Sequence, residues 1–319
     1  MTSLVSIIMP VRNGGEYLTE CVDSIIAQSY TNWELLVVDD HSSDKTWETL
    51  CKYASVDKRV KTFRNSGKGI LPALRLAYAH SAGHLVTRMD ADDIMEVDKL
   101  KLLTESTING SVAIGLVNYF AENGVADGYK KYAGWLNELT QKAANFTDIY
   151  KECTVPSTCW MLTREDLDRC GGFGDRYPED YDLAFRMKKC GLKIKPIRQV
   201  LHQWRDHTGR ASRNDPNYKD NRFLEIKTTY FLELDRNMSN PLTLIGAGKK
   251  GKEIAKLLQT QNVSFDWATN NPRKIGVNIF GIHLKSEAGI SDLSQVIVAV
   301  AGKEGDQLRI AYPKGYFFC

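Results

Sequence analysis

The chain has 319 residues, of which 43% are hydrophobic and 25% charged, and its formal net charge is +3. The length fits one large domain plus a small one, and the composition is that of an ordinary folded protein. So small a charge argues against nucleic-acid binding, the first residues do not resemble a signal peptide, and no stretch reaches the roughly 18 apolar residues that span a bilayer. Any membrane contact would therefore be peripheral.

The first hundred residues alternate between strand and helix patterns. Apolar and β-branched runs predict strands at Val5–Val11, Trp33–Val38, Val60–Phe63 and His84–Val86. Apolar residues at helical spacing predict helices over Leu18–Ile26, Trp47–Ala54 and Leu71–Tyr78. Asn13 with Glu16 resembles a capping box for the first helix, and Pro72 fits the first turn of the third. This alternation predicts a mainly parallel sheet between helices, with ligands beyond the carboxyl ends of the strands.

Carboxylates gather where these strands end. Asp39 and Asp40 follow the second strand, and Asp90, Asp92 and Asp93 follow the fourth. Carboxylates at one rim repel one another unless a cation joins them, and Mg²⁺ or Mn²⁺ binds through one or two carboxylates plus substrate phosphates. The Asp-x-Asp turn therefore indicates a metal-diphosphate site. The alternative is a solvated acidic turn that caps a helix beginning near Glu96.

The segment from Gly110 to Thr154 has no pattern that places its elements. After it we expect a strand at Cys159–Leu162, a flexible glycine loop at Gly171–Gly174, and a helix from about Glu179 to Cys190 that ends at Gly191.

An amphipathic helix is expected from about Tyr218 to Asp235, with basic residues Lys219, Arg222 and Lys227. Packing against the first domain is the main interpretation, and membrane contact is the alternative.

The seven cysteines are odd in number and show no Cys-x-x-Cys spacing. Cys21, Cys51 and Cys190 fall on apolar faces of expected helices. These features are typical of reduced thiols, so the expected location is the cytoplasm.

Asn237–Pro241 resembles a linker, so we expect domains at residues 1–236 and 241–319. A strand ending at Ile245 leads directly into the glycines Gly246, Gly248 and Gly251 and then a helix, with Asp266 about twenty residues further on, as in a dinucleotide fingerprint. These glycines would form a phosphate loop. Some eighty residues supply only half of a usual dinucleotide-binding domain. We therefore expect a small Rossmann-like accessory domain that serves assembly or binds a nucleotide or nucleotide-sugar. A chain ending near Asn240 would be expected to fold and act without it.

The order of these pieces resembles the family-2 glycosyltransferases of GT-A fold, of the bacterial polysaccharide or glycolipid type, over roughly residues 4 to 213. The matching segments are Val5–Asn13, Glu34–Asp44, Arg88–Asp93, Gly171–Phe173, Glu179–Leu183, and Trp204–His207 with Ser212. The sequence departs from the family at Arg75, Val97 and Trp204, where asparagine, proline and tyrosine are common. None of these changes removes a carboxylate that the chemistry needs. The implied fold is a GT-A nucleotide-diphospho-sugar transferase domain plus a small Rossmann-like α/β domain.

The resemblance also implies roles for single residues. Asp40 would hydrogen-bond the base, most often uracil, and Asp90, Asp92 and His207 would hold Mn²⁺ or Mg²⁺, with Asp92 preferred as the direct ligand and Asp93 as an auxiliary contact. A purely structural role is an equal alternative for His207. The residues expected to bind the nucleotide-sugar are Pro10, Val11, Arg12, Asn13, Asp40, Lys68, Arg88, Asp90, Ala91, Asp92 and Arg205.

Asp180, with Glu179 beside it, would supply catalysis as the general base for an acceptor hydroxyl. Its place at a helix N-terminus favours the ionised form that a base needs. One base, with no second carboxylate as nucleophile, implies a single displacement and inversion. The alternative for both acids is helix capping.

The expected function is therefore metal-dependent, inverting transfer of a hexose from a nucleotide-sugar, a UDP-sugar, to a saccharide or lipid-linked acceptor at the inner face of the membrane. A homo-oligomer is a further expectation, and nucleic acid is not an expected partner. One rival is a sugar nucleotidyltransferase, which would need a basic, glycine-rich triphosphate loop where Pro10–Gly15 stands. The other is a non-catalytic nucleotide-binding module, against which Asp92 and Asp180 argue.

Overall fold

The computed structural model describes residues 2–210 and 222–319, which divide into two compact units. The first unit combines residues up to Thr147 with Thr154–Arg210. The second combines Asp148–Cys153 with the described chain after Arg210. Each unit has its own sheet.

The first unit contains an eight-stranded sheet in the order β3-β2-β1-β4-β7-β6-β8-β5. Its strands are β1 (Val5–Val11), β2 (Trp33–Asp39), β3 (Val60–Arg64), β4 (Leu85–Arg88), β5 (Ile94–Met95), β6 (Ser111–Phe120), β7 (Trp160–Thr163) and β8 (Lys193–Arg205). Its helices are α1 (Leu18–Ile26), α2 (Thr46–Val56), α3 (Ile70–Ala79), α4 (Lys99–Ser106), α5 (Asp127–Gln141), α6 (Arg164–Arg169) and α7 (Glu179–Lys189). Strands β1 to β4 are mutually parallel where they pair, whereas β7 and β5 run antiparallel to their neighbours.

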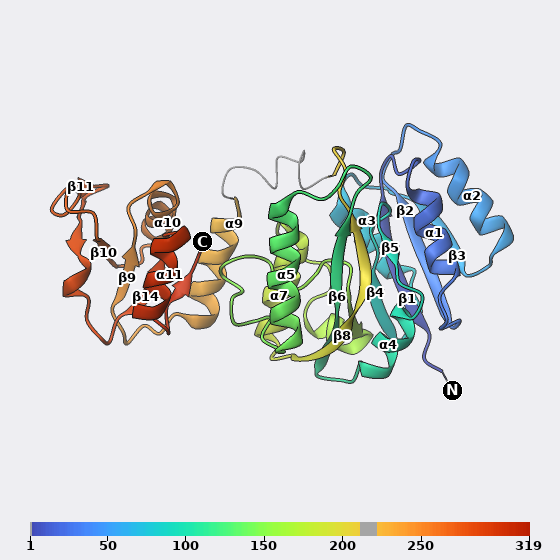
Figure 1. Cartoon of the computed structure of the whole chain (residues 1–319). Coiled ribbons are helices and arrows are strands. Elements are labelled where there is room, and N and C mark those ends of the chain that lie inside the picture. The colour runs from blue at the N-terminus through green and yellow to red at the C-terminus, as the bar shows by residue number, and fades with distance from the viewer. Residues whose placement is uncertain (1, 211–221) are drawn as a thin grey trace. The chain divides into compact units, whose positions relative to one another are not determined.

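Helices cover both faces of this sheet. Residues of α1, α2, α4 and α5 share one core cluster with the strands, whereas the buried residues of α3 lie outside that cluster and α3 packs on β1 and β2 from the other face. Figure 1 shows the blue helix α2 and the green helix α5 on either side of the strands in that view. Every residue of β2 is buried, as expected for a strand with helices on both faces. The predicted mainly parallel sheet between helices is thus confirmed, and the carboxyl ends of β1, β2 and β4 form one rim.

Two sequence-based expectations about helix starts were wrong. Asn13 and Glu16 do not cap α1, which begins at Leu18 without a side-chain cap. Asn13 has a positive φ of 53°, and its side-chain oxygen accepts a hydrogen bond from the Ser43 backbone N–H at 2.9 Å. The helix expected near Glu96 begins at Lys99, because the short strand β5 comes first.

The unassigned middle of the chain contains β6 and α5. The first seven residues of β6 are all buried, so they show no alternation, and α5 buries only Ala133, Leu136 and Thr140. The buried run of β6 therefore gives no period-two signal, whereas the buried residues of α5 have the i, i+3, i+7 spacing of a helix face, a signal that the sequence analysis missed.

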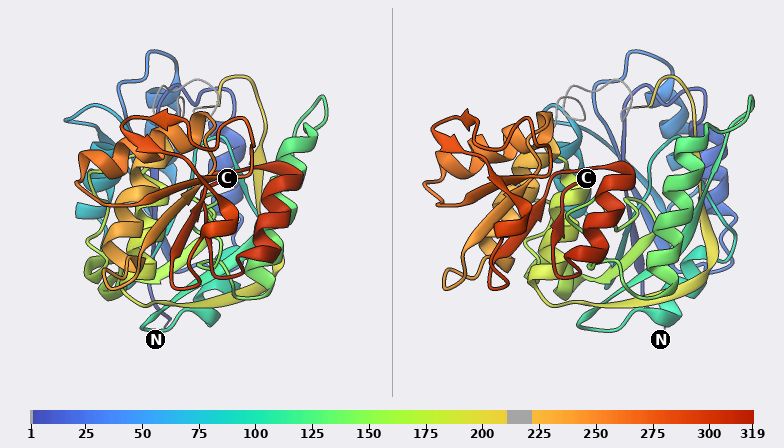
Figure 2. Two further views of the ribbon diagram at one scale, coloured as in Figure 1. Left: turned by 90° about the vertical axis from the view of Figure 1, so that its left-hand side faces the viewer. Right: turned by 60° about the vertical axis from the view of Figure 1, so that its left-hand side comes forward.

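The second unit has a fully parallel five-stranded sheet in the order β13-β10-β9-β14-β15. Its elements are α9 (Arg222–Tyr230), the π-helical turn η2 (Phe231–Asp235), β9 (Leu242–Ile245), α10 (Lys249–Thr260), β10 (Asp266–Thr269), β11 (Asn278–Ile279), β12 (Ile282–His283), β13 (Lys285–Ser286), the 3₁₀ turn η3 (Glu287–Gly289), β14 (Gln295–Val298), α11 (Gly302–Ala311) and β15 (Tyr316–Phe317). From the central strand β9 the chain first adds β10 and β13 on one side of the sheet and then crosses over to add β14 and β15 on the other. This is a Rossmann-like order. Figure 2 shows these orange-to-red strands side by side.

Asp266, the acid at the spacing of the dinucleotide fingerprint, lies at the wrong end of its strand. Asp266 opens β10 and pairs in register with Thr243 at the start of β9, whereas the glycine loop follows Ile245 at the other end. Asp266 instead forms an ion pair with Lys285 at 2.6 Å. The dinucleotide fingerprint is therefore incomplete.

The glycine loop itself is built as expected. Gly246 has a φ of +105°, and a Cβ on Gly251 would lie 2.0 Å from the Gly246 carbonyl oxygen. Gly251 is thus required for close packing of α10 on the loop. Whether Gly246, Gly248 and Gly251 bind phosphate stays a prediction.

The helix expected to pack on the first domain belongs to the second unit, so the units do not divide at residue 236. Lys227, expected on a basic surface, is buried and donates to the Lys151 carbonyl at 2.8 Å. Tyr218 and Lys219 lie outside the described residues. Over the ranges that the structure describes, no helix is both long and apolar enough to cross a membrane.

Tyr150 packs against the last residues of the chain, and this contact changes what we expect of a chain that ends near Asn240. Tyr150 stacks on Phe318 at 5.4 Å between ring centroids, and neighbouring Ile149 is fully buried. A chain ending at Asn240 lacks Tyr316 and Phe318, so it should expose the Tyr150 ring and lose on the order of 3–5 kcal/mol at this aromatic site. Thermal unfolding and binding of a hydrophobic dye by the fragment and the full chain would measure this. A soluble fragment with the full chain's cooperative transition and no dye binding would contradict it.

Candidate active site

Arg88, the last residue of β4, joins two acids from distant parts of the chain. Its Nε donates to Asp90 Oδ1 at 2.9 Å, and its Nη1 donates to Glu179 Oε1, also at 2.9 Å. The side chains of Arg88 and Glu179 are 6% and 3% exposed, and that of Asp90 is 29% exposed. The guanidinium therefore fixes the start of α7 against the Asp-x-Asp turn.

Asp180 follows Glu179 and has a strongly altered acidity. Burial, and next the negative charge of Glu179, raise the pKa of Asp180 to about 7, although the Arg88 charge opposes the shift. The Tyr181 backbone N–H donates to Asp180 Oδ1 at 2.7 Å. The helix N-terminus was expected to favour the ionised form, but burial and the neighbouring charge outweigh it. An acid with a pKa near 7 is suited to proton transfer at neutral pH.

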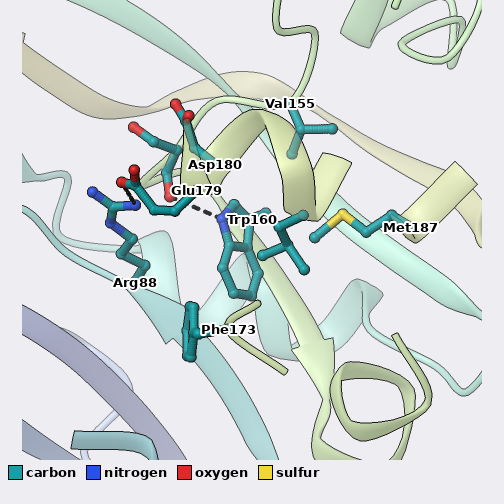
Figure 3. A pocket seen from close by; sticks show the side chains of 9 residues that line it. Arg88, Val155, Trp160, Phe173, Glu179, Asp180 and Met187 are labelled. Carbon is teal, nitrogen blue, oxygen red and sulfur yellow. Dashed lines mark hydrogen bonds and ion pairs between the residues drawn. The ribbon is translucent and has the colours of Figure 1, made fainter. Parts of the chain in front are cut away.

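Glu179 and Asp180 line a pocket with an apolar wall. The pocket is lined by Arg88, Val155, Ser157, Trp160, Phe173, Glu179, Asp180, Leu183 and Met187. Figure 3 shows Glu179 beside Arg88 at one end of the pocket, with Val155 and Met187 at the other. Among the described residues, no group donates a hydrogen bond to the buried Glu179 Oε2. A buried carboxylate oxygen without a donor retains the capacity to accept a hydrogen bond.

Asp92 is held from the other side of the turn. Its Oδ2 lies 3.0 Å from His207 Nε2, and its carbonyl accepts a hydrogen bond from Arg205 Nε at 2.9 Å. Arg205 also pairs with Glu20, and its guanidinium lies 4.6 Å from the centre of the Tyr17 ring. Arg205 is therefore a buried brace of the turn, and a contact with a diphosphate stays a prediction.

A buried charged network under the turn was not predicted from the sequence. Asp93 Oδ2 lies 3.0 Å from His202 Nε2, and Lys99 Nζ lies 2.9 Å from His202 Nδ1 and 2.6 Å from the Thr158 carbonyl. Burial raises the pKa of Asp93 to about 7 and lowers those of Lys99 and His202. Trp204, which replaces a common tyrosine, donates to Thr158 Oγ1 at 2.9 Å. A lysine on an amphipathic helix gives no sequence signal of such burial, because most helical lysines are exposed.

The predicted metal ligands lie at one rim but do not form a closed cage. Across residues 2–210 and 222–319, no group of three or more His, Cys, Asp and Glu side chains is placed to hold a metal ion. Asp90, Asp92 and His207 nevertheless fit a divalent cation, because they are partly exposed oxygen and nitrogen donors with Asp92 beside His207. The metal assignment stays a prediction.

The expected base-binding side surrounds Asp40, at the carboxyl end of β2. Asp40 Oδ1 accepts a hydrogen bond from Asn65 Nδ2 at 2.7 Å, and both its oxygens lie 3.0 Å from the Gly69 backbone N–H. Lys68 is exposed and adjoins Gly69, and Pro10–Asn13 extend from β1 at the same rim. Asp40 thus holds a loop, and its contact with a base stays a prediction.

The loop Gly171–Gly174, expected to be flexible, is tied by arginines. Arg75 Nε donates to the Phe173 carbonyl at 2.8 Å and its Nη2 to the Gly174 carbonyl at 2.6 Å. Arg186 Nη1 donates to the Gly172 carbonyl at 2.7 Å. These bonds hold Phe173 in the pocket wall, which explains the arginine at position 75.

Comparison with known proteins adds independent support to this geometry. Residues 6–171 match the model of the family described as glycosyl transferase family 2. The chain is 31% identical over 225 residues to the glycosyltransferase GlyG of Streptococcus pneumoniae serotype 4, covering 67% of this chain and 75% of GlyG.

Two solved structures share the fold. A 1–349 fragment of S. aureus TarS, in complex with UDP-GlcNAc, superposes with a TM-score of 0.58 at 17% identity, covering 80% of this chain and 71% of that one. The mannosyltransferase PcManGT of Pyrobaculum calidifontis, in complex with GDP-Man and Mn²⁺, gives a TM-score of 0.50 at 19% identity, covering 79% and 68%. At these identities the likeness establishes the fold alone.

The geometry around Asp180 predicts a measurable change in acidity. Its folded-state pKa lies above the unfolded value of about 3.9, so its contribution to folding stability is present below that pH and is lost as pH rises through about 7. Glu179→Gln removes the neighbouring charge and should lower the pKa of Asp180, as measured by carboxyl ¹³C NMR. The exposed Glu165, changed to Gln, is the control and should leave that pKa unchanged. An unaltered pKa in Glu179→Gln would show that Glu179 does not influence Asp180.

Proposed function

The chain belongs to glycosyl transferase family 2 and is a glycosyltransferase, and from this premise we propose that it moves a hexose from a UDP-sugar to a hydroxyl of a saccharide or lipid-linked saccharide, with inversion and with Mn²⁺ or Mg²⁺. One observation carries the proposal. Arg88 links Asp90, on the expected donor side, to Glu179 and thus to Asp180 on the pocket side. Family membership sets aside the nucleotidyltransferase and the non-catalytic module.

The donor part of the proposal is supported by the rim and by the relatives. Parallel strands β1 and β2 bring Pro10–Asn13 and Asp40 to the same end of the sheet, where nucleotides bind in such folds. The solved relatives hold UDP-GlcNAc and GDP-Man, both nucleotide-sugars. A UDP-hexose is our choice because the resemblance at Asp40 favours uracil.

Asp90, Asp92 and His207 are the residues that would hold the divalent cation. When bound, such a cation stabilises the negative charge that develops on the departing diphosphate. The PcManGT complex contains Mn²⁺, which supports this choice of cofactor. Arg88 keeps Asp90 oriented, and His207 does the same for Asp92.

Asp180 would accept the proton of the acceptor hydroxyl as that oxygen attacks the anomeric carbon. The new C–O bond forms on the face opposite the nucleoside diphosphate, whose bond to the anomeric carbon breaks, so the configuration inverts. Glu179 is unsuited to be a covalent nucleophile because Arg88 holds its Oε1. Its Oε2 would instead accept a hydrogen bond from a saccharide hydroxyl.

The two acids suit the acceptor class, because their carboxylate oxygens can accept hydrogen bonds from saccharide hydroxyls. Trp160 and Phe173 are buried and support the apolar wall behind them. A lipid-linked acceptor would be presented at the membrane, so peripheral contact at its cytoplasmic face belongs to this proposal.

Asp180→Asn should keep the fold and donor binding but lower turnover by roughly 10²- to 10⁴-fold, the range for loss of a general base. In the wild type, kcat/KM should rise with pH through about 7, because only the ionised carboxylate accepts a proton. Both are measured by release of UDP from a panel of UDP-hexoses. Asp292→Asn, an exposed carboxylate of the second unit, is the control. Wild-type turnover in Asp180→Asn would exclude it as the base.

Asp92→Asn removes a charge but little volume at the rim. It should abolish activation by Mn²⁺ while the melting temperature changes little, because its side chain is 31% exposed. The test is a Mn²⁺ titration of UDP-sugar turnover beside a thermal melt. Undiminished Mn²⁺ activation would refute the metal assignment.

A further inference from the structure

The segment Asp148–Cys153, here called the clasp segment, consists of turns, yet three of its residues are buried and the other three are half-buried. It is counted with the second unit, while the chain on both sides belongs to the first. Ile149 and Tyr150 are 0% and 3% exposed. Connecting loops usually run over the surface, so this burial indicates a specific binding site for the segment.

The ring of Tyr150 lies in an aromatic cage of the second unit. It stacks on Phe318 with an interplanar angle of 5° and makes edge contacts with Tyr316 and Phe231. Its hydroxyl donates to Asp235 Oδ2 at 2.5 Å. A stacked and hydrogen-bonded tyrosine is well fixed, because both its apolar face and its polar end have partners.

Polar contacts hold the residues on both sides of Tyr150. Asp148 forms an ion pair with Arg309 of α11 at 2.8 Å. The Lys151 carbonyl accepts from Lys227 Nζ of α9 at 2.8 Å, and burial lowers the pKa of Lys227 to about 8. The clasp segment is therefore held at successive residues by α9, η2, α11 and the chain at β15.

The chain that leaves the clasp segment enters the pocket wall at once. The Thr154 carbonyl accepts from Asn145 Nδ2 at 2.7 Å, and Val155 and Ser157 line the pocket. The Ser157 carbonyl accepts from Trp160 Nε1 at 2.8 Å. Only one residue, Thr154, separates the clasp segment from the pocket. A displacement of Cys153 should therefore also displace Val155.

We propose that the clasp segment sets the position of the pocket wall at residues 155–160, so that the second unit is a positioning element for the acceptor and Tyr150 a positioning residue. The catalytic consequence rests on the proposed function, whereas the coupling of the clasp segment to the wall does not. The second unit is then more than a removable accessory.

Hydrogen exchange of the full-length chain tests the coupling directly. The variants are Tyr150→Ala, Tyr150→Phe and the control Ile310→Ala, which changes an exposed residue of α11 next to Arg309. Tyr150→Ala should increase exchange about tenfold or more in peptides covering residues 155–160, because their opening costs less once the wall is untied. Ile310→Ala should leave the exchange of these peptides unchanged. The exchange of a peptide covering β1 should be the same in all variants.

Kinetics then separate positioning from general damage. With UDP-glucose as donor and p-nitrophenyl β-glucoside as acceptor probe, Tyr150→Ala should raise the acceptor KM about tenfold and leave the KM for donor hydrolysis unchanged. If the wild type does not turn over UDP-glucose but Tyr150→Ala still shows increased exchange, the coupling is supported and UDP-glucose is not the donor.

The proposal is overturned if folded Tyr150→Ala exchanges like the wild type at residues 155–160. Should that variant fail to fold, Tyr150→Phe decides, because it removes only the hydrogen bond to Asp235. Tyr150→Phe should show a smaller increase in the same peptides, and unchanged exchange there would equally overturn the proposal.

Discussion

The bridge that Arg88 makes between two carboxylates is the constraint on which the site depends. Carboxylates at the end of β4 and the start of α7 can be neighbours only if a positive charge lies between them, and Arg88 supplies it at 2.9 Å to both Asp90 and Glu179. Arginine suits this position because its planar guanidinium offers several donors at fixed angles. Loss of such a buried partner typically costs about 3–5 kcal/mol, since an unpaired charge remains. Through Glu179 the same contact sets the surroundings of Asp180.

The other side of the Asp-x-Asp turn is braced in a similar way. Asp93 accepts a hydrogen bond from the Arg205 backbone N–H at 3.0 Å and contacts His202, so β8 is pinned to the turn. Lys99 places a buried donor behind His202. The turn is thus held from β4 and from β8, which leaves Asp90 and Asp92 partly exposed but oriented. Preorganised acids of this kind suit a site where charge changes during the reaction.

The second unit has its own Rossmann-like sheet, yet it is not independent of the first along the chain. Its buried residues include Tyr150, which comes from the middle of the first unit's sequence. Its glycine loop is sterically formed, but Asp266 lies at the opposite end of the sheet. The structure therefore gives more support to a mechanical role through the clasp segment than to dinucleotide chemistry.

The sequence by itself determined strands β1 to β4 and β7, the rim on which Asp40, Asp90 and Asp92 stand, and the helix that carries Asp180, because local periodicity reports burial and parallel alternation brings strand ends together. Only the tertiary structure decided what depends on distant partners. Arg88 and Glu179 are 91 positions apart, and neither their contact nor the resulting pKa of Asp180 has a local signature. Likewise, Asp266 has the expected spacing, but strand register, which spacing does not encode, puts it at the wrong end of the sheet. The turns of the clasp segment show no periodic pattern, so only the packing around Tyr150 revealed them.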